Sequence, residues 1–290
     1  MSNQPSKLTP ANQEQVVRAE RFHRLHETPT PLRLVNAWDR FSARVFSLAG
    51  APAIGTSSFA VALAHGYWDG QQIPWTVAQE VVAEIVNAAG DLPVTADIES
   101  GRGHTTSEVA ATVDDVISVG AVGVNIEDSL PGSPGELFAL ETQCEQLRAA
   151  RAAAERRSLP LFINARCDVY FGAQVADAER PRQLLDRAGA YAESGASGVF
   201  VPGLIDLDLL ARLSESVDVP VSVMMLPGLP SIEALATVGV RRISQGGASF
   251  VLAAGFLERT TKAFLEGPLE TVGGDVEPAG HLIPDLVTRP

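Results

Sequence analysis

Short apolar runs recur along this chain, and each is followed by a longer stretch in which apolar residues return at helical spacing. A short apolar run bounded by Gly, Pro or polar residues is typical of a buried strand, and the longer pattern is typical of an amphipathic helix. We therefore expect strands over 32–36, 51–55, 92–97, 121–127, 159–166, 198–201, 219–224 and 240–244. The expected helices that follow them cover 41–49, 76–89, 106–119, 136–156, 177–193, 207–216, 232–238 and 248–265.

The regular alternation of strand and helix predicts the fold class. Strands that are each followed by a helix form a parallel sheet, and eight such units are the number that closes a (β/α)8 TIM barrel. Several of the expected helices end in a glycine directly before a strand, as in left-handed helix caps: Gly90, Gly120, Gly195 and Gly239. An open doubly wound sheet is the alternative, but no Gly-x-Gly-x-x-Gly follows the first strand to indicate a dinucleotide site.

The pattern predicts one domain with two appendages. Residues 1–27 form an arm and a first helix over 14–26, which the segment Thr28-Pro29-Thr30-Pro31 ends. Residues 28–266 form the barrel. The tail, 267–290, is rich in Gly and Pro and either lies on the surface or crosses to a neighbouring subunit.

Composition narrows the possible partners. The formal net charge of −13 leaves no surplus of Lys and Arg to neutralise phosphates, so we expect no nucleic-acid partner. No apolar stretch approaches the length of a membrane span, and residues 1–10 lack the apolar core of a signal peptide. Cys144 and Cys167 form no CxxC pair, which favours two reduced thiols. We expect a soluble, cytoplasmic protein without a membrane partner.

Two acids follow the third expected strand. Asp97 and Glu99 are separated by one residue, and a Gly-x-Gly bend comes next at Gly101 and Gly103. Side chains alternate faces in an extended segment, so both carboxylates should point the same way and repel each other unless a cation lies between them. The alternative is a solvated loop that carries two unrelated acids.

The same arrangement occurs after two further strands. Asn125 and Glu127 end the fourth expected strand, and Asn164 and Arg166 end the fifth. All share the parity of Asp97 and Glu99 near the carboxyl ends of strands. In a barrel these ends meet at the catalytic mouth, so the side chains should converge there.

The chemistry of the converging residues indicates a hard divalent cation. Asp97, Glu99 and Glu127 offer oxygen ligands with no His or Cys beside them, which suits Mg²⁺, with Mn²⁺ possible, and disfavours zinc. Arg166 suits the carboxylate of a substrate. The alternative for Arg166 is a salt bridge to Glu127 or Asp168, and both roles can hold at once.

A turn after the second expected strand is a candidate anion site. Ser57, Ser58 and Phe59 follow this strand directly, and small residues with free backbone N–H groups at a strand-to-helix turn can receive an anion. An ordinary Ser N-cap is the alternative.

Together these motifs resemble the isocitrate lyase/phosphoenolpyruvate mutase superfamily over residues 32 to 265. The segments that carry the resemblance are Asn36-Ala37-Trp38-Asp39, Thr56-Ser57-Ser58, Gly66-Tyr67-Trp68-Asp69-Gly70, Asp97-x-Glu99-x-Gly101-x-Gly103, Asn125-Ile126-Glu127-Asp128, Asn164-Ala165-Arg166-x-Asp168 and Phe200-Val201-Pro202-Gly203. The resemblance implies a (β/α)8 barrel whose last helix is swapped between subunits, in homodimers or homotetramers. It also implies Mg²⁺ and substrates that are small 2-oxo acids or their enols.

The resemblance implies roles for individual residues. Asp97 would be the direct metal ligand, Glu99 and Glu127 would contact its waters, and Asp69 would lie near the metal shell. Arg166 would grip the substrate. The implied cradle for a carboxylate or phosphonate is Ser57, Ser58 and Phe59, and we add Asn164 to the predicted substrate-binding residues. The predicted catalytic residues are Arg166, Glu127 and Asp69.

The sequence also departs from the family pattern. Isocitrate and methylisocitrate lyases carry a Lys-Lys/Arg-Cys-Gly-His loop after the fourth strand, whereas 129–136 contains no Cys, Lys or His here. Cys144 lies too far along, inside an expected helix, to replace that cysteine. Members that handle phosphonates place a Lys- and Asn-bearing gating loop there and a His after the sixth strand, where this chain has Pro202.

The function expected from the sequence is a Mg²⁺-dependent lyase, or a related hydrolase. It would cleave a C–C bond next to a 2-oxo acid, such as an oxaloacetate-like substrate, through a metal-stabilised enolate. Two alternatives stay open. One is P–C chemistry of the phosphonopyruvate or phosphoenolpyruvate mutase type, and the other is a non-catalytic protein that binds 2-oxo acids.

Overall fold

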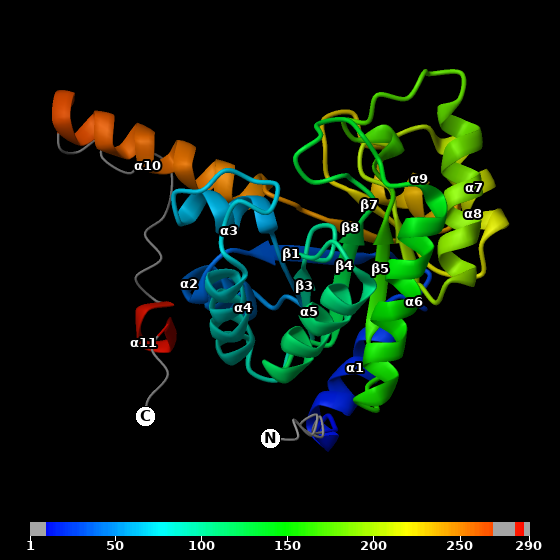
Figure 1. Ribbon diagram of the computed structural model, residues 1–290. Helices are drawn as coiled ribbons and strands as arrows, with labels where there is room; N and C mark the ends of the chain where they lie inside the picture. The colour runs from blue at the N-terminus through cyan, green and yellow to red at the C-terminus, as the bar shows by residue number, and fades with distance from the viewer. Residues whose placement is uncertain (1–9, 269–281, 287–290) are drawn as a thin grey trace.

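The strands form a closed parallel barrel in the computed structural model, which describes residues 10–268 and 282–286 (Figure 1). Each strand pairs with its neighbours in sequence, and β1 pairs with β8 to close the ring. The predicted TIM barrel is confirmed, and the open sheet is excluded. The strands are β1 (Leu32–Ala37), β2 (Ile54–Thr56), β3 (Val94–Asp97), β4 (Gly123–Glu127), β5 (Phe162–Arg166), β6 (Gly198–Phe200), β7 (Val221–Met224) and β8 (Val240–Ser244).

Most of the helices surround this barrel, and the eight helices expected after strands agree with their expected ranges to within a few residues. All four glycines expected to cap helices have positive φ, as a left-handed cap requires. The helices are α1 (Gln13–Leu25), α2 (Arg40–Leu48), α3 (Ser58–Ala64), α4 (Trp75–Ala89), α5 (Thr106–Ser118), α6 (Leu140–Arg156), α7 (Arg180–Glu193), α8 (Leu207–Ser216), α9 (Ile232–Thr237), α10 (Ala248–Glu266) and α11 (Ile283–Leu286).

Helix α3 was not expected from the sequence. Its residues follow β2 after a single residue, Ser57, whose side chain accepts a hydrogen bond from the backbone N–H of Ala60. The N-cap interpretation of Ser57 is therefore confirmed, and the segment is a helix start rather than an open turn. A short 3₁₀ turn, Asp168–Tyr170, was also missed after β5.

Helix α1 contacts the amino-terminal end of the barrel. The ring of Phe22 lies 5.3 Å from that of Phe162 on β5, and His26 stacks on Phe162 at 4.1 Å. Burial lowers the pKa of His26 to about 3, so this histidine is neutral at physiological pH. Helix α1 therefore lies at the end of the barrel opposite the acidic residues, which are at the carboxyl ends of the strands.

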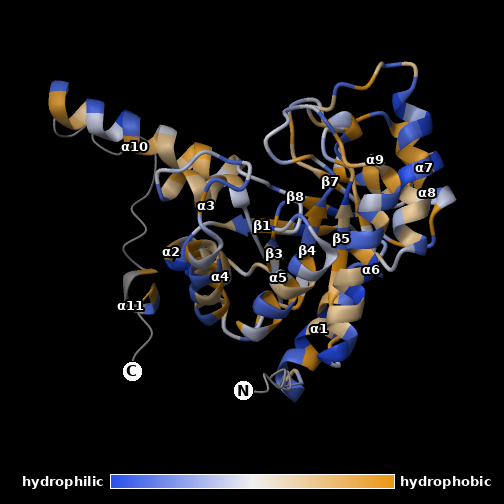
Figure 2. Cartoon of the chain, viewed as in Figure 1, coloured by the Kyte–Doolittle hydropathy of each residue, from blue (hydrophilic) through white to orange (hydrophobic). Residues whose placement is uncertain are grey.

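Helix α10 extends away from the barrel (Figure 1), and it has no buried residue. Hydrophobic residues nevertheless occur along the length of this helix (Figure 2). Leu252 is 70% exposed, Leu257 63% and Leu265 71%. The expected arm and tail lie largely outside the described residues. No described helix combines the length and apolarity needed to cross a membrane.

Candidate active site at the barrel mouth

A cavity of about 260 Å³ opens at the carboxyl ends of the strands. Its lining includes six predicted site residues: Ser57, Ser58, Phe59, Asp69, Asp97 and Arg166. Asp69 lines this cavity and a second one nearby. Two buried asparagines, Asn36 and Asn125, also line this cavity. The structure thus brings together the segments that follow β2, β3, β4 and β5.

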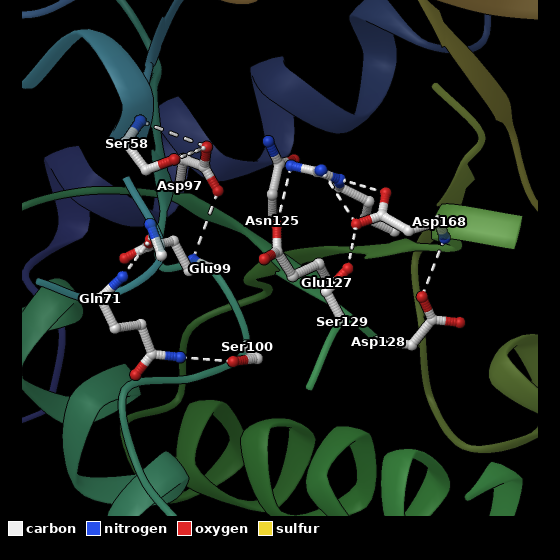
Figure 3. A network of polar contacts seen from close by, with 12 residues as sticks. Ser58, Gln71, Asp97, Glu99, Ser100, Asn125, Glu127, Asp128, Ser129 and Asp168 are labelled. Atoms are coloured by element: carbon white, nitrogen blue, oxygen red, sulfur yellow. Dashed lines mark hydrogen bonds and ion pairs between the residues drawn. The ribbon is translucent and has the colours of Figure 1, made fainter. Parts of the chain in front are cut away.

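Asp97 is fixed by hydrogen bonds from its neighbours. The hydroxyl of Ser58 donates to Asp97 Oδ2 at 2.8 Å, and the Ser58 backbone N–H donates to the same oxygen at 3.3 Å (Figure 3). The backbone N–H of Asp97 donates to Thr56 Oγ1 at 2.8 Å. The start of α3 therefore orients the carboxylate that the sequence predicted as the direct metal ligand, and Ser58 contacts this carboxylate within the cavity.

Glu99 holds the loop that carries Asp69. Strand β3 ends at Asp97 and Glu99 has φ +52°, so the strand alternation no longer sets its direction. Glu99 Oε1 accepts hydrogen bonds from the backbone N–H groups of Gly70 and Gln71, at 2.9 and 2.6 Å. Its other oxygen forms an ion pair with Arg102, whose guanidinium also donates to the Ile73 carbonyl oxygen. The carboxylate is largely engaged with protein groups.

Burial raises the pKa of Glu99 to about 7, and the charges of Asp97 and Asp69 add to this effect against the opposing charge of Arg102. A raised folded-state pKa means that the folded protein binds a proton that the unfolded chain has lost. Stability should therefore fall as pH rises from about 4.5, the ordinary value, to about 7.

We expect the Glu99→Gln variant to lose this part of the pH dependence. The measurement is the free energy of urea unfolding in chelator-containing buffer, at intervals across this pH range. Glu141→Gln, on the exposed face of α6, serves as the control with an unchanged slope. A Glu99→Gln slope identical to that of the wild type would contradict the assignment.

Glu127 and Arg166, each partly buried, form a clamp with the buried Asp168. Arg166 donates from Nη1 to Glu127 Oε2 at 2.8 Å, and from Nε and Nη2 to the two oxygens of Asp168 at 2.6 and 2.9 Å. The salt bridges considered for Arg166 therefore both exist. Burial raises the pKa of Glu127 well above its ordinary value, although the charge of Arg166 opposes this. Burial lowers the pKa of Arg166, but Glu127, Asp168 and Asp97 outweigh it, so the pKa is raised.

A second polar network, which the sequence interpretation missed, holds the turn that carries Asp168 of this clamp. Asp128 is fully buried and accepts hydrogen bonds from the hydroxyl of Tyr191 at 2.6 Å and from Arg187 at 3.2 Å. Its other oxygen accepts from the backbone N–H of Asp168 at 2.8 Å. The network ties β4 and α7 to the turn after β5. Asp128 was identified from the sequence only as part of a motif. Because Asp128 directly follows Glu127, its side chain should point to the opposite face of the strand, and this was the available sequence signal for a separate role.

Asn164 does not line the mouth. Its side chain is fully buried, and its Nδ2 donates to Asn125 Oδ1 at 2.9 Å. Arg242 on β8 was missed altogether, although it is fully buried and donates to the same oxygen at 3.4 Å. The sequence signal was the pair Arg241-Arg242 within an expected strand, since alternation must direct one of the two into the barrel.

The segment 129–136 forms a folded flap over the second cavity, of about 290 Å³. Ser129 and Leu137 form an antiparallel bridge, and the Ser129 hydroxyl donates to Asp168 at 2.5 Å. The backbone N–H of Gln174 donates to the Gly135 carbonyl oxygen at 2.8 Å. Ser129 to Pro134 line the cavity opposite Asp69 and Glu127, so the flap presents hydroxyl, apolar and backbone groups but no Cys, Lys or His.

The donor set at the mouth fits a hard divalent cation that keeps most of its waters. Within the described residues no three His, Cys, Asp or Glu side chains form a ready-made metal cluster. Burial and mutual repulsion raise the pKa of Asp69, Glu99 and Glu127, which indicates an excess of carboxylate over cationic groups. One direct carboxylate with water-bridged partners is the arrangement that Mg²⁺ commonly adopts. Asp97 would be that carboxylate, with Asp69 and Glu127 within the surrounding shell.

Comparisons with known proteins point to one family. A family model described as phosphoenolpyruvate phosphomutase matches residues 22–265. An uncharacterised protein of Mycobacterium tuberculosis strain H37Rv is 36% identical over 230 residues, which are 79% of this chain and 83% of that protein. An oxaloacetate decarboxylase of Pseudomonas fluorescens strain SBW25 is 29% identical over 241 residues, covering 80% of this chain and 79% of that protein.

Solved structures agree with the sequence comparisons. The crystal structure of a candidate phosphonomutase from Burkholderia cenocepacia J2315 superimposes with a TM-score of 0.82 at 41% sequence identity. The match covers 86% of this chain and 99% of that chain.

Proposed function

This chain belongs to the phosphoenolpyruvate phosphomutase family, within the isocitrate lyase/phosphoenolpyruvate mutase superfamily, and from that premise we propose that it is a Mg²⁺-dependent lyase. Its substrate would be a small 2-oxo acid of the oxaloacetate type, and the reaction would cleave the C–C bond between the carbon next to the oxo group and the carboxylate that this carbon carries. The related hydrolysis of such an acid belongs to the same proposal.

The observation that carries this proposal is the composition of the mouth. One small cavity holds a carboxylate suited to Mg²⁺, hydrogen-bond donors and the only guanidinium among its lining residues, Arg166. The flap above the neighbouring cavity offers no side chain that can protonate a leaving group at neutral pH. Decarboxylation suits such a site because carbon dioxide leaves without protonation, whereas isocitrate-type cleavage needs a protein acid.

The residues would divide the work as follows. A bound Mg²⁺ supplies a Lewis acid that stabilises negative charge on the oxo oxygen. Asp97 holds the ion, and Ser58 keeps Asp97 in place. Arg166, oriented by Glu127 and Asp168, offers its charge to a substrate carboxylate. The C–C bond breaks, its electron pair moves into the enolate, carbon dioxide leaves, and water returns a proton to carbon.

The direct test is an assay of a panel of 2-oxo acids, including oxaloacetate, with Mg²⁺ and with chelator. We expect enzymatic loss of carbon dioxide or oxalate release that stops when chelator is added and returns with Mg²⁺. Turnover that persists at full rate in chelator would contradict the proposal. Binding of these acids without any turnover would favour the non-catalytic alternative.

Phosphonate chemistry is the second candidate, because the matched family model and the Burkholderia relative both carry phosphomutase-type descriptions. Against it, Pro202 follows β6 at the position where family members that handle phosphonates carry a His. In addition, neither cavity lining contains a Lys or His. Phosphorus NMR of phosphonopyruvate incubated with the protein and Mg²⁺ distinguishes the two. New phosphate or phosphoenolpyruvate signals would favour this candidate.

We further propose a homo-oligomer in which α10 packs on a second copy. A groove of about 540 Å³ lies along the outer side of β1 and β8, lined by Val35, Ile243 and Leu229 among others. In a barrel this is the position that the last helix covers, yet α10 extends away from it (Figure 1). The exposed apolar side chains of α10 are suited to such a groove on a partner copy.

For this oligomer we expect Leu252→Asp and Leu257→Asp to lower the molar mass in light scattering to that of one chain. The apolar contacts that these residues would make cannot accept a charge. Lys262→Asp, on an exposed side chain of the same helix, is the control and should leave the mass unchanged. A monomeric wild-type protein would contradict the proposal.

A further inference from the structure

Asn125 occupies the position between the predicted metal ligand and a buried polar layer. It is the register partner of Asp97 on β3 and of Asn164 on β5, so the three side chains follow one another across the inner face of the barrel. Asn125 is only 5% exposed, but it lines the mouth cavity together with Asp97 and Arg166. Figure 3 shows it between Asp97 and Glu127.

Two hydrogen-bond donors from the buried polar layer fix the orientation of the Asn125 carboxamide. Asn125 Oδ1 accepts from Asn164 Nδ2 at 2.9 Å and from Arg242 Nη2 at 3.4 Å. A guanidinium has only donors, so the atom that faces Arg242 must be the amide oxygen. The amide nitrogen of Asn125 therefore faces the cavity, and its two N–H groups are directed away from the buried layer.

Arg242 is a buried charge that the protein compensates only weakly, because burial lowers its pKa to about 9 against the opposing charge of Asp97. It is fully buried, its Nε and Nη1 atoms have no hydrogen-bond partner, and no carboxylate among the described residues lies within ion-pair distance of it. A buried charge without a partner lowers stability, and an apolar side chain of similar size would fit such a site at lower cost. Within the described part of the chain, the guanidinium of Arg242 donates one hydrogen bond, which goes to Asn125.

We propose that Asn125 donates a hydrogen bond from Nδ2 to an oxygen of the bound 2-oxo acid, and that Arg242 and Asn164 are positioning residues that hold the Asn125 amide in this orientation. The inference rests on the proposed function for the class of ligand. It adds a neutral donor at the cavity floor, between the carboxylate of Asp97 and the guanidinium of Arg166. Asn164 then acts through Asn125 rather than by direct contact with the substrate.

The decisive variant is Asn125→Asp. An aspartate at this position keeps an acceptor for Asn164 and gives Arg242 a carboxylate partner, so the fold should be at least as stable as the wild type. The same substitution replaces the cavity-facing donor by an oxygen. We expect oxalate, a planar dianion that resembles the enolate of a 2-oxo acid, to bind at least roughly 10–100-fold more weakly in calorimetry, because the variant loses a hydrogen bond to a charged group and adds a negative charge beside the dianion.

Arg242→Met tests the positioning role. We expect this variant to unfold at the same or a higher temperature than the wild type, because it removes an unpartnered buried charge. It should nevertheless bind oxalate several-fold more weakly, since Asn164 alone then orients Asn125. In an Asn125→Ala background, Arg242→Met should have no further effect on oxalate binding, because the group it orients is absent.

A spectroscopic measurement separates contact from structural support. In nitrogen-15 NMR the side-chain amide signal of Asn125 should shift on addition of oxalate with Mg²⁺ much more than that of Asn164. Wild-type oxalate affinity in both Asn125→Asp and Asn125→Ala would overturn the proposal, as would a wild-type protein that does not bind oxalate. Oxalate binding with these losses, but without turnover of any 2-oxo acid, would refute the proposed lyase activity and leave this inference intact.

Discussion

The variant Asp97→Ala should lose roughly 10³-fold or more of any Mg²⁺-dependent turnover of 2-oxo acids. Stabilising a developing enolate with a cation is worth several kcal/mol, and about 4 kcal/mol corresponds to a factor of roughly 10³ in rate. Asp97 lines the mouth cavity, and Ser58 holds its carboxylate in position. Isothermal titration with Mg²⁺ should show weakened binding in parallel with the loss of turnover.

Asp97→Asn distinguishes loss of charge from loss of structure. The amide oxygen can still accept from the hydroxyl and backbone N–H of Ser58, so the free energy of unfolding should stay close to that of the wild type. Turnover should fall as far as in Asp97→Ala because the anionic ligand is gone. Asp91→Asn, an exposed aspartate before the same strand, is the matched control. Full Mg²⁺-dependent activity in Asp97→Asn would exclude Asp97 as the metal ligand.

The variant Arg166→Met should lower the free energy of unfolding by about 3–5 kcal/mol, because it leaves the buried Asp168 and the partly buried Glu127 without their cation. Glu127 and Asp168 flank the guanidinium, and the side chain of Asp168 is only 2% exposed. Activity should be abolished as well, since the same guanidinium is the proposed carboxylate grip. Urea unfolding monitored by fluorescence gives the stability, and the 2-oxo acid assay gives the activity.

The loss of stability in Arg166→Met should depend on pH. Without the arginine, burial raises the pKa of Glu127 still further above its ordinary value of 4.5. A carboxyl group with a raised folded-state pKa is neutral in the folded protein at acidic pH, so the deficit should be smallest near pH 4.5 and should grow as pH rises.

Two further variants serve as comparisons for Arg166→Met. Arg166→Lys keeps one charge but cannot bind Asp168 with two parallel hydrogen bonds, so it should recover part of the stability and little of the activity. Arg148→Met removes an exposed arginine paired with Glu141 and should change stability by well under 1 kcal/mol. A fully stable Arg166→Met protein would show that the clamp does not require its cation.

The barrel and most of its mouth followed from local patterns in the sequence. Strand alternation has a period of two, so the parity of Asp97, Asn125, Glu127 and Arg166 already placed them on one side of their strands. The parallel arrangement then brought neighbouring strand ends together, and the register pairs Asp97 with Asn125 and Glu127 with Arg166. These positions depend on backbone geometry alone, which the order of apolar and polar residues encodes.

How deeply each site side chain is buried, and which groups it contacts, depends on segments that are far apart in the sequence. Glu99 lies beyond the end of β3, where alternation no longer applies, and the loop at Gly70 and Gln71 engages its carboxylate. Asn164 has the expected parity but is fully buried, and its side chain donates to Asn125 instead of lining the cavity. Arg242 belongs to the last strand, and only closure of β8 onto β1 and the resulting interior brings it against Asn125.

The sequence by itself therefore determined the fold, the face on which the functional side chains lie and the acidic, oxygen-rich character of the mouth. Only the tertiary structure decided which of these side chains reach the cavity and which are engaged by one another. The reason is physical: side-chain direction follows from the local backbone, whereas burial and pairing arise from segments such as α3, the flap and β8 that meet only after the barrel closes.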